Sequence, residues 1–466
     1  MFVSIYQMLR LVSIIGLAYC IIVQCTSCAN IIPPGGGPRD SLPPVLVKAT
    51  PDVMSKHIIP KKITLTFNEY VQLQDIGQNL ICYPNPKITP IVESKLKNVT
   101  IKIRDTLQPN TTYVFELGNA IRDINENNAI NTFTYVFSTG DHIDSLTLSG
   151  KVILAETGKT DSTMIAVLHR KRYDSAVSKE RPDYYTKING NGYFNFRFLP
   201  KDTFDIYALK DENGTKKYIS SKQLFAFADK PVIAGEADSI MLYAYVAEKD
   251  APKASTTTTP KATVKDSLKY TTNLEGGQQD LLSTLNINLN KKIAHFDSTK
   301  IFLADTSVQH IAHSVLQLDS TQQILSIHYN WQADTKYKLI INKDAVKDST
   351  ANTLTKNDTL SFTTKKTENY GSVKLRFTNA VTDSSLVLLL IQNDKIVETF
   401  PINNIVWYRK LFNPGEYEIR ILHDKNKNGK WDTGNFKKRI QPEIIESLSQ
   451  KLTVRSNWDN ELDIKL

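Results

Sequence analysis

The fold of this chain is decided by the stretch Lys62-Ile63-Thr64-Leu65-Thr66-Phe67, in which polar and apolar side chains alternate. The same alternation runs through Asn98-Val99-Thr100-Ile101-Lys102-Ile103. A period of two is typical of half-buried strands in antiparallel sheets, where one face packs against a core and the other meets solvent. Turn sequences recur between such segments, and no segment shows a sustained helical period with caps at both ends. We therefore predict an all-β fold of tandem β-sandwiches.

One type of sandwich occurs twice in the sequence. Asn110-Thr111-Thr112-Tyr113-Val114-Phe115 is followed by Ile121-Arg122-Asp123, and the pattern returns as Asp334-Thr335-Lys336-Tyr337-Lys338-Leu339 followed by Val346-Lys347-Asp348. The spacing between matching residues is nearly constant, which is the signature of an internal repeat. These segments predict two related modules, A at residues 43–141 and A′ at residues 268–366.

A second pair of modules fills the gaps. Gly192-Tyr193-Phe194-Asn195-Phe196 has a counterpart near the end of the chain in Asn413-Pro414-Gly415-Glu416-Tyr417, and both lead to Asp- and Asn-rich turns. These hairpins predict module B at residues 145–248 and module B′ at residues 368–466. Residues 249–266 are rich in Thr, Pro and Lys, which predicts an extended linker. The predicted order is A, B, linker, A′, B′, a string of small independent cores.

Module A resembles a bacterial Ig-like domain of the type found in S-layer proteins. The resemblance rests on an opening Pro43-Pro44, the strand Ile63–Glu69, the segment Leu107–Tyr113, a turn from Asp123 to Asn127, and the closing Phe137-Ser138-Thr139-Gly140. Module A′ lacks the proline before its tyrosine strand. Modules B and B′ look like the prealbumin-like or carboxypeptidase-regulatory β-sandwich, a resemblance that implies a seven-stranded spacer module.

The first residues of the chain look like an export signal. An uncharged run from Leu11 to Val23 follows Arg10 and is too short for a membrane span, which needs roughly 20 apolar residues. Cys25-Thr26-Ser27-Cys28 then resembles a bacterial lipobox, although Cys25 stands where a lipobox carries Leu. The resemblance implies a signal peptide at residues 1–27, lipidation of Cys28 and a flexible tether at residues 28–42. An ordinary secretory signal is the alternative.

This leader predicts a lipid-anchored protein of the Gram-negative cell envelope, placed at the outer membrane, with the membrane as a partner. Of the four cysteines, Cys20 and Cys25 lie in the predicted signal peptide and Cys28 is the predicted lipidation site. After cleavage, Cys82 therefore has no thiol with which to form an internal disulfide. Net charge is +9, from 57 Lys and Arg against 48 Asp and Glu, with no run of five basic residues. Without a basic stripe interleaved with aromatics, the sequence does not predict a nucleic-acid partner.

One loop has the spacing of a calcium site. Oxygen-bearing side chains at Asp424, Asn426, Asn428 and Asp432, with Gly429 at the bend, follow the opening of a calcium-binding loop. Position 12 is Asn435 instead of a bidentate Glu, so a bound ion would be held weakly. The alternative is a hairpin loop whose Asx side chains accept hydrogen bonds from its own amides. No other cofactor is predicted.

Motifs of catalysis are absent from the sequence, which lacks a Gly-X-Ser-X-Gly elbow, a His-Glu-X-X-His pair and a phosphate-binding glycine loop. We therefore predict a non-enzymatic envelope lipoprotein with a structural, adhesive or assembly role. The alternative is a glycan-binding protein, assisted by calcium at the Asp424 loop, in which Trp407, Tyr408 and Trp431 would stack on sugar rings. Buried sandwich aromatics are the other interpretation of these residues.

Overall fold

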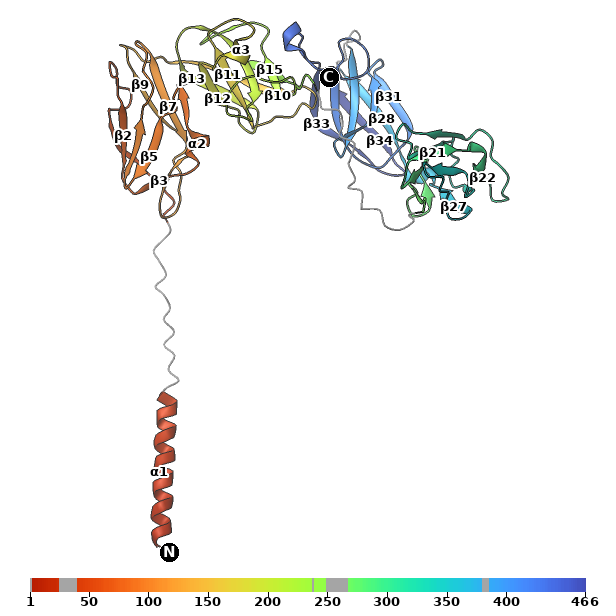
Figure 1. Cartoon of the computed structure of the whole chain (residues 1–466), viewed down its shortest axis with the longest axis horizontal. Helices are drawn as coiled ribbons and strands as arrows, with labels where there is room; N and C mark the ends of the chain where they lie inside the picture. The colour runs from red at the N-terminus through yellow and green to blue at the C-terminus, as the bar shows by residue number, and fades with distance from the viewer. Residues whose placement is uncertain (1, 25–39, 237–238, 249–266, 379–384) are drawn as a thin grey trace. The chain divides into compact units, whose positions relative to one another are not determined.

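The structure is a computed structural model that describes residues 2–24, 40–236, 239–248, 267–378 and 385–466 (Figure 1). Cys28 and the predicted linker 249–266 lie outside the described residues. The fold is all-β, as predicted: strands make up most of the regular structure, and apart from α1 (Phe2–Gln24) the helices are single turns. The chain divides into two compact units, Met1–Cys82 with Pro86–Ile143 (unit 1) and Tyr83–Asn85 with Asp144–Leu466 (unit 2).

The helix α1 contains residues 2–24 of the predicted signal peptide. All side chains from residue 7 to residue 19 in this helix are exposed. Across the described ranges, no helix has the length and apolar character that crossing a membrane requires.

Unit 1 holds the strands of module A around one core. Its short elements are β1 (Leu46–Thr50), β2 (Lys62–Phe67), β3 (Val71–Leu73), α2 (Ile76–Asn79), β4 (Ile81–Tyr83), β5 (Ile91–Lys95), β6 (Asn98–Lys102), β7 (Thr112–Gly118), β8 (Ile121–Asp123) and β9 (Phe133–Ser138). One sheet has the order β1-β2-β6-β5, the facing sheet has β4-β7-β9, and β3 pairs with β8. The alternation in Lys62–Phe67 has the predicted effect, because Ile63, Leu65 and Phe67 are buried while the residues between them are not.

Unit 2 begins with the strands of module B. They are β10 (Leu146–Leu154), β11 (Met164–His169), β12 (Tyr184–Lys187), β13 (Tyr193–Leu199), β14 (Thr203–Lys210), β15 (Phe225–Phe227), β16 (Val232–Ile233) and β17 (Ile240–Ala244), with α3 (Ala176–Lys179). One sheet has the order β13-β10-β17 and the other β12-β11-β14-β15, with β16 on β14. Strand β10 runs parallel to β17, so the closing strand returns beside the opening one.

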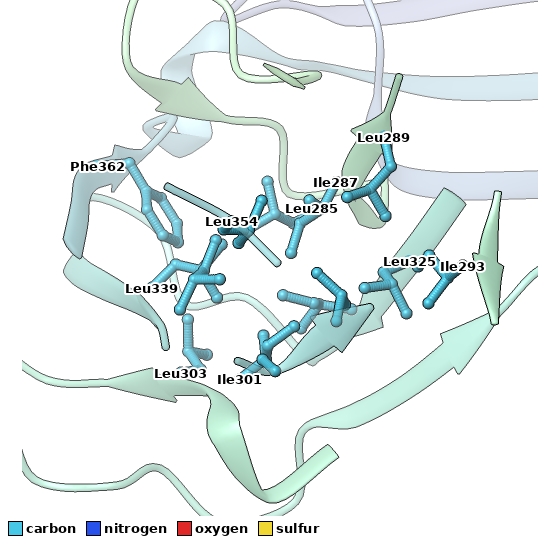
Figure 2. Close-up of a cluster of buried hydrophobic side chains, with 14 of the residues drawn as sticks. Leu285, Ile287, Leu289, Ile293, Ile301, Leu303, Leu325, Leu339, Leu354 and Phe362 are labelled. Carbon is cyan, nitrogen blue, oxygen red and sulfur yellow. The ribbon is translucent and has the colours of Figure 1, made fainter. Parts of the chain in front are cut away.

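The strands of module A′ enclose a core of buried hydrophobic side chains (Figure 2). They are β18 (Tyr270–Thr272), β19 (Gln278–Gln279), β20 (Leu285–Leu289), β21 (Ile293–Phe296), β22 (Ile301–Ala304), β23 (Val315–Leu318), β24 (Ile324–His328), β25 (Lys336–Ile341), β26 (Val346–Asp348) and β27 (Asp358–Thr364), with η1 (Ser298–Lys300). Leu285 and Leu339 meet in this core from two different sheets, β18-β20-β24-β23 and β19-β27-β25-β22.

Module B′ closes the chain. Its elements are η2 (Thr367–Asn369), β28 (Gly371–Thr378), β29 (Leu386–Gln392), β30 (Lys395–Pro401), β31 (Val406–Phe412), β32 (Gly415–His423), η3 (Phe436–Lys438), β33 (Ile444–Val454) and β34 (Asp459–Lys465). The sheets have the orders β31-β28-β34 and β30-β29-β32-β33. Strand β28 runs parallel to β34, as β10 does to β17.

Sheet topology shows the same internal repeat as the sequence. The sheet β1-β2-β6-β5 of A has its counterpart in β18-β20-β24-β23 of A′, and the pair β3-β8 has its counterpart in β21-β26. The two sheets of B, β13-β10-β17 and β12-β11-β14-β15, correspond strand by strand to β31-β28-β34 and β30-β29-β32-β33 of B′. Two sandwich topologies therefore each occur twice.

Candidate functional site

An aromatic side chain of B′ completes the core of B. Phe436 lies in the loop that joins β32 to β33, which we call the B′ loop (residues 424–443), and its side chain is 9% exposed. Its ring centroid is 5.1 Å from that of Phe225 and 5.2 Å from that of Phe227, in edge-to-face geometry at both contacts. Tyr207 and Tyr218 of B also contact it. Edge-to-face packing is favourable because the positive ring edge meets the negative ring face.

Hydrogen bonds hold the two modules together around this ring. The Thr433 hydroxyl donates to the Val246 carbonyl oxygen at 2.7 Å, and the Ile445 backbone N–H donates to the Ala155 carbonyl oxygen at 2.8 Å. The Gln441 side-chain amide donates to the Phe227 carbonyl oxygen at 3.0 Å. These bonds satisfy backbone acceptors at the contact, where an unpaired buried carbonyl would be costly.

Glycine allows this close approach at one position in the B′ loop. A Cβ atom at Gly434 would lie 2.7 Å from the Tyr245 ring, inside the distance that side-chain carbons tolerate. The next residues, Asn435 and Phe436, turn the chain so that the phenyl ring enters module B. We expect any larger residue at 434 to separate the modules.

Strand β29 explains why B′ needs a partner. Leu388 and Leu390 pack into the core of B′, while Val387, Leu389 and Ile391 form a second buried cluster on the other face of the same sheet. A strand that is apolar on both faces belongs to a sheet covered on both sides. The B′ loop supplies part of this cover, because Trp431 packs both on this cluster and on the aromatic core of B.

The prediction of independent cores therefore needs correction for B and B′. Phe436 belongs to the buried cluster of B, although B′ is the last module in the sequence and A′ stands between them. The physical reason is that the outer face of β29 and the open edge of the B core are both apolar, and each is buried only when the two modules meet.

The B′ loop keeps its shape through its own carboxylates. Asp424 is 2% exposed, and its Oδ2 accepts the Gly429 backbone N–H at 2.7 Å. Glu443, 4% exposed, accepts the backbone N–H of Lys425 at 2.8 Å on Oε1 and that of Asp432 at 3.1 Å on Oε2. Charge-assisted bonds of this kind are stronger than neutral ones. The loop is a network of Asx and Glu acceptors around backbone donors.

The residues predicted to bind calcium lie together in this network. Asn426 and Asn428 both donate their side-chain amides to Oδ2 of Asp432, and Asn428 Oδ1 accepts the Lys430 backbone N–H. The bond from the Lys430 N–H, like the one from the Gly429 N–H to Asp424, is of the kind expected for a hairpin loop whose Asx side chains accept hydrogen bonds from its own amides. Within the described residues, no group of three or more His, Cys, Asp or Glu side chains is arranged to hold a metal ion. Weak calcium binding here stays a prediction.

The residues predicted to bind a glycan are not brought to one surface. Trp407 is half-buried, stacks on Phe400 with ring centroids 4.2 Å apart, and packs against the inner core of B′. Trp431 packs against the opposite face of the sheet that contains β29, and its indole N–H donates to the Glu443 carbonyl oxygen. Tyr408 is 58% exposed on the edge strand β31. Of the three predicted residues, Tyr408 is the one whose ring is open to a sugar.

Two aspartates at equivalent positions of A and A′ anchor equivalent turns within their own modules. Asp123, 1% exposed, accepts the backbone N–H groups of Glu126 and Asn128 at 2.6 and 2.7 Å. Asp348, 6% exposed, accepts the Asn352 side-chain amide at 3.0 Å and the Thr350 backbone N–H at 2.9 Å. The Asn352 amide is the largest influence that lowers the pKa of Asp348 to about 2. These carboxylates stabilise turns, as acceptors of this type commonly do.

A buried histidine lies in the core of B. His169 is 1% exposed, and its ring meets that of Tyr207 edge to face at 5.9 Å. Its Nε2 has no hydrogen-bond partner among the described residues. Burial lowers its pKa to about 4, because the charged imidazolium would lose its hydration. His169 is therefore a neutral core residue at pH 7.

Comparison with known families identifies one module. Residues 40–139 match the family model described as the bacterial Ig-like domain, which confirms the resemblance predicted for module A. A search of curated proteins gave no match.

Superpositions on solved structures cover much of this chain but have low TM-scores. The major pilin subunit BcpA of Bacillus cereus is 10% identical, with 69% of this chain and 99% of that chain covered at a TM-score of 0.17. Domains 1–6 of the surface layer protein SbsC are 12% identical, with 91% and 55% covered at 0.16. The BSP domain of a biofilm associated protein is 10% identical, with 92% and 100% covered at 0.15. TM-scores this low carry no argument about this chain.

Proposed function

We propose that this chain is a non-catalytic lipoprotein of the Gram-negative cell envelope, anchored through Cys28, whose β-sandwiches have a structural, adhesive or assembly role. The observation that carries the structural part is the insertion of Phe436 into the core of B. A contact of this kind makes one stiff body from two modules, which suits a protein that must hold a fixed geometry. The lipobox-like sequence supports the anchor, and the bacterial Ig-like module A supports a place in the envelope.

The anchor is tested by metabolic labelling with a clickable fatty acid. We expect label on the wild-type chain and on the Cys25→Ala variant, and none on Cys28→Ala, because the thiol at 28 is the proposed acyl acceptor. Fractionation should place the labelled protein with the outer membrane. An unlabelled wild-type chain with an uncleaved leader would show that the anchor does not exist.

Glycan binding is the second candidate, and the exposure of Tyr408 supports it. A sugar ring stacked on this residue at the β31 edge would depend on its aromatic face. A glycan array should then lose its signal with Tyr408→Ala and keep it with Trp431→Phe, since Trp431 packs inside unit 2. An array without any signal from the wild-type chain would remove this candidate.

A further inference from the structure

In the B′ loop the acidic side chains point inward, whereas the lysines are exposed. Its acidic residues, Asp424, Asp432 and Glu443, point into the loop, where their oxygens accept the hydrogen bonds described above. Its lysines are all exposed: Lys425, Lys427, Lys430, Lys437 and Lys438. Among the ion pairs of the described residues, the one that involves a basic residue of this loop joins Arg439 to Asp174, and none involves these five lysines. The outer surface of this loop is therefore basic, even though its composition is mixed.

Aliphatic side chains are exposed beside these lysines. Ile440 is 50% exposed at the base of the small hairpin formed by Asn435 and Ile440. Ile219 is 56% exposed in the loop of module B that joins β14 to β15. The two loops meet because Tyr218 contacts Phe436, and Ile219 and Lys437 line the same open hollow. One end of unit 2 thus carries five lysines and two exposed isoleucines, with Glu248 as the acidic residue that lines the hollow.

We propose that this surface, the five lysines of the B′ loop with Ile219 and Ile440, docks onto the head groups of an anionic lipid bilayer. Lysines near a negatively charged membrane surface are attracted to it within about a Debye length. Exposed aliphatic side chains among them gain by entering the boundary between head groups and acyl chains. The combination is typical of proteins that lie on a membrane without crossing it.

The observations favour a bilayer over a soluble polyanion. A single-stranded nucleic acid is bound through exposed aromatic rings that stack on bases, but both aromatic residues of the B′ loop, Trp431 and Phe436, pack inward. Planar recognition of isolated phosphates favours Arg, but the arginine of this loop, Arg439, pairs with Asp174. The other basic residues of the loop are lysines, which act as point charges. A hydrophilic polyanion would also gain nothing from the two isoleucines.

Vesicle co-sedimentation tests this inference independently of the acyl anchor. The protein would be residues 40–466, which contain both sets of sandwiches and lack Cys28. The described side chains of α1, residues 7–19, are exposed, so removal of the helix should leave the cores intact. Vesicles of phosphatidylcholine with phosphatidylglycerol would be compared with phosphatidylcholine alone. We expect binding to the anionic vesicles at low salt, at least 10-fold weaker binding at high salt, and little binding to the neutral ones.

Charge variants locate the surface. Lys427→Glu, Lys430→Glu and Lys437→Glu together should weaken vesicle binding at least 10-fold. The matched control reverses three exposed lysines of A′, Lys336, Lys343 and Lys356, and should leave binding within about 2-fold. Equal loss in both triple variants would overturn the proposal, because it would show attraction to net charge alone. Unchanged melting temperatures would show that both variants fold.

The isoleucines distinguish a bilayer from other polyanions. Ile219→Ser with Ile440→Ser keeps the charge and should weaken vesicle binding several-fold, while leaving retention on a heparin column unchanged. A variant that binds vesicles as well as the wild-type chain would contradict docking into the head groups. Binding of soluble dextran sulfate with no binding to anionic vesicles would also overturn the proposal, in favour of a polysaccharide partner.

Discussion

Phe436 and Phe225 pack edge to face with their ring centroids 5.1 Å apart, although they come from modules separated in sequence by a whole third module. This pair shows that B and B′ are stabilised by each other. Other contacts at the same place, such as the bond from Ile445 N–H to the Ala155 carbonyl, extend the joint along the strand β33.

Removal of this ring should destabilise unit 2. Phe436→Ala leaves a cavity among the rings of Phe225, Phe227 and Tyr218 and should lower the free energy of unfolding by about 3 kcal/mol. Urea unfolding followed by tryptophan fluorescence measures the loss. Lys437→Ala, at the exposed neighbouring position, is the control and should change stability by less than about 0.5 kcal/mol. Equal stability of the two variants would mean that the ring is not part of the core.

His169 should give unit 2 an acid-sensitive stability. Its pKa is about 4 in the folded chain, against about 6.5 when unfolded, so the unfolded chain takes up a proton first as the pH falls. Stability from the neutral ring is fully present above pH 6.5 and declines toward pH 4, by on the order of 3 kcal/mol. His169→Phe should flatten this part of the pH profile of the melting temperature. An unchanged slope in His169→Phe would show that burial of this ring does not cause the acid sensitivity.

Asp348 should affect stability in a lower pH range than His169. Its folded pKa is about 2, below the value of about 3.9 for an unfolded chain. Its contribution is therefore present above pH 4 and is lost as the pH falls from 4 to 2. Asp348→Asn should lower the melting temperature at pH 7, and the difference from the wild-type chain should shrink as pH 2 is approached. A difference that stays constant with pH would show that the charge of Asp348 does not matter.

The stability of the B′ loop should depend on Asp424 even when no metal is added. Asp424→Ala removes the acceptor of the Gly429 and Asn428 backbone N–H groups and should cost about 1–2 kcal/mol in a buffer that contains EDTA. Calcium should then change the melting temperatures of wild-type and variant chains equally. Protection of the wild-type chain alone by calcium would instead establish the ion site that the spacing Asp424, Asn426, Asn428, Asp432 predicts.

The sequence predicts the sandwiches well because their signal is local. The alternation in Lys62–Phe67 corresponds to β2, and Asn98–Ile103 contains β6 (Asn98–Lys102). The repeated residues Tyr113 and Tyr337 lie in equivalent strands, β7 and β25. The alternation of polar and apolar residues depends on the two faces of a single strand, so each strand shows it whichever strands it pairs with.

The joint between B and B′ could not be predicted in the same way, because it depends on residues far apart in the chain. Phe436 lies in a polar loop, in which the spacing of Asp and Asn residues predicts a calcium site and gives no sign of a contact with module B. One signal was available: Val387-Leu388-Leu389-Leu390-Ile391 is apolar without interruption, which predicts burial on both faces of β29. A second was the pair Trp431 and Phe436, two large aromatics in a loop that would otherwise be expected to face water.

The distance between B and B′ in solution tests the central claim most directly. Nitroxide labels would be placed at Lys230→Cys in B and Lys395→Cys in B′, both exposed positions, in residues 40–466 with Cys82→Ala. Electron spin resonance should then give one narrow distance distribution, which broadens when Phe436→Ala is added. A distribution that is already broad with Phe436 present, and that the substitution does not change, would show that B and B′ move independently.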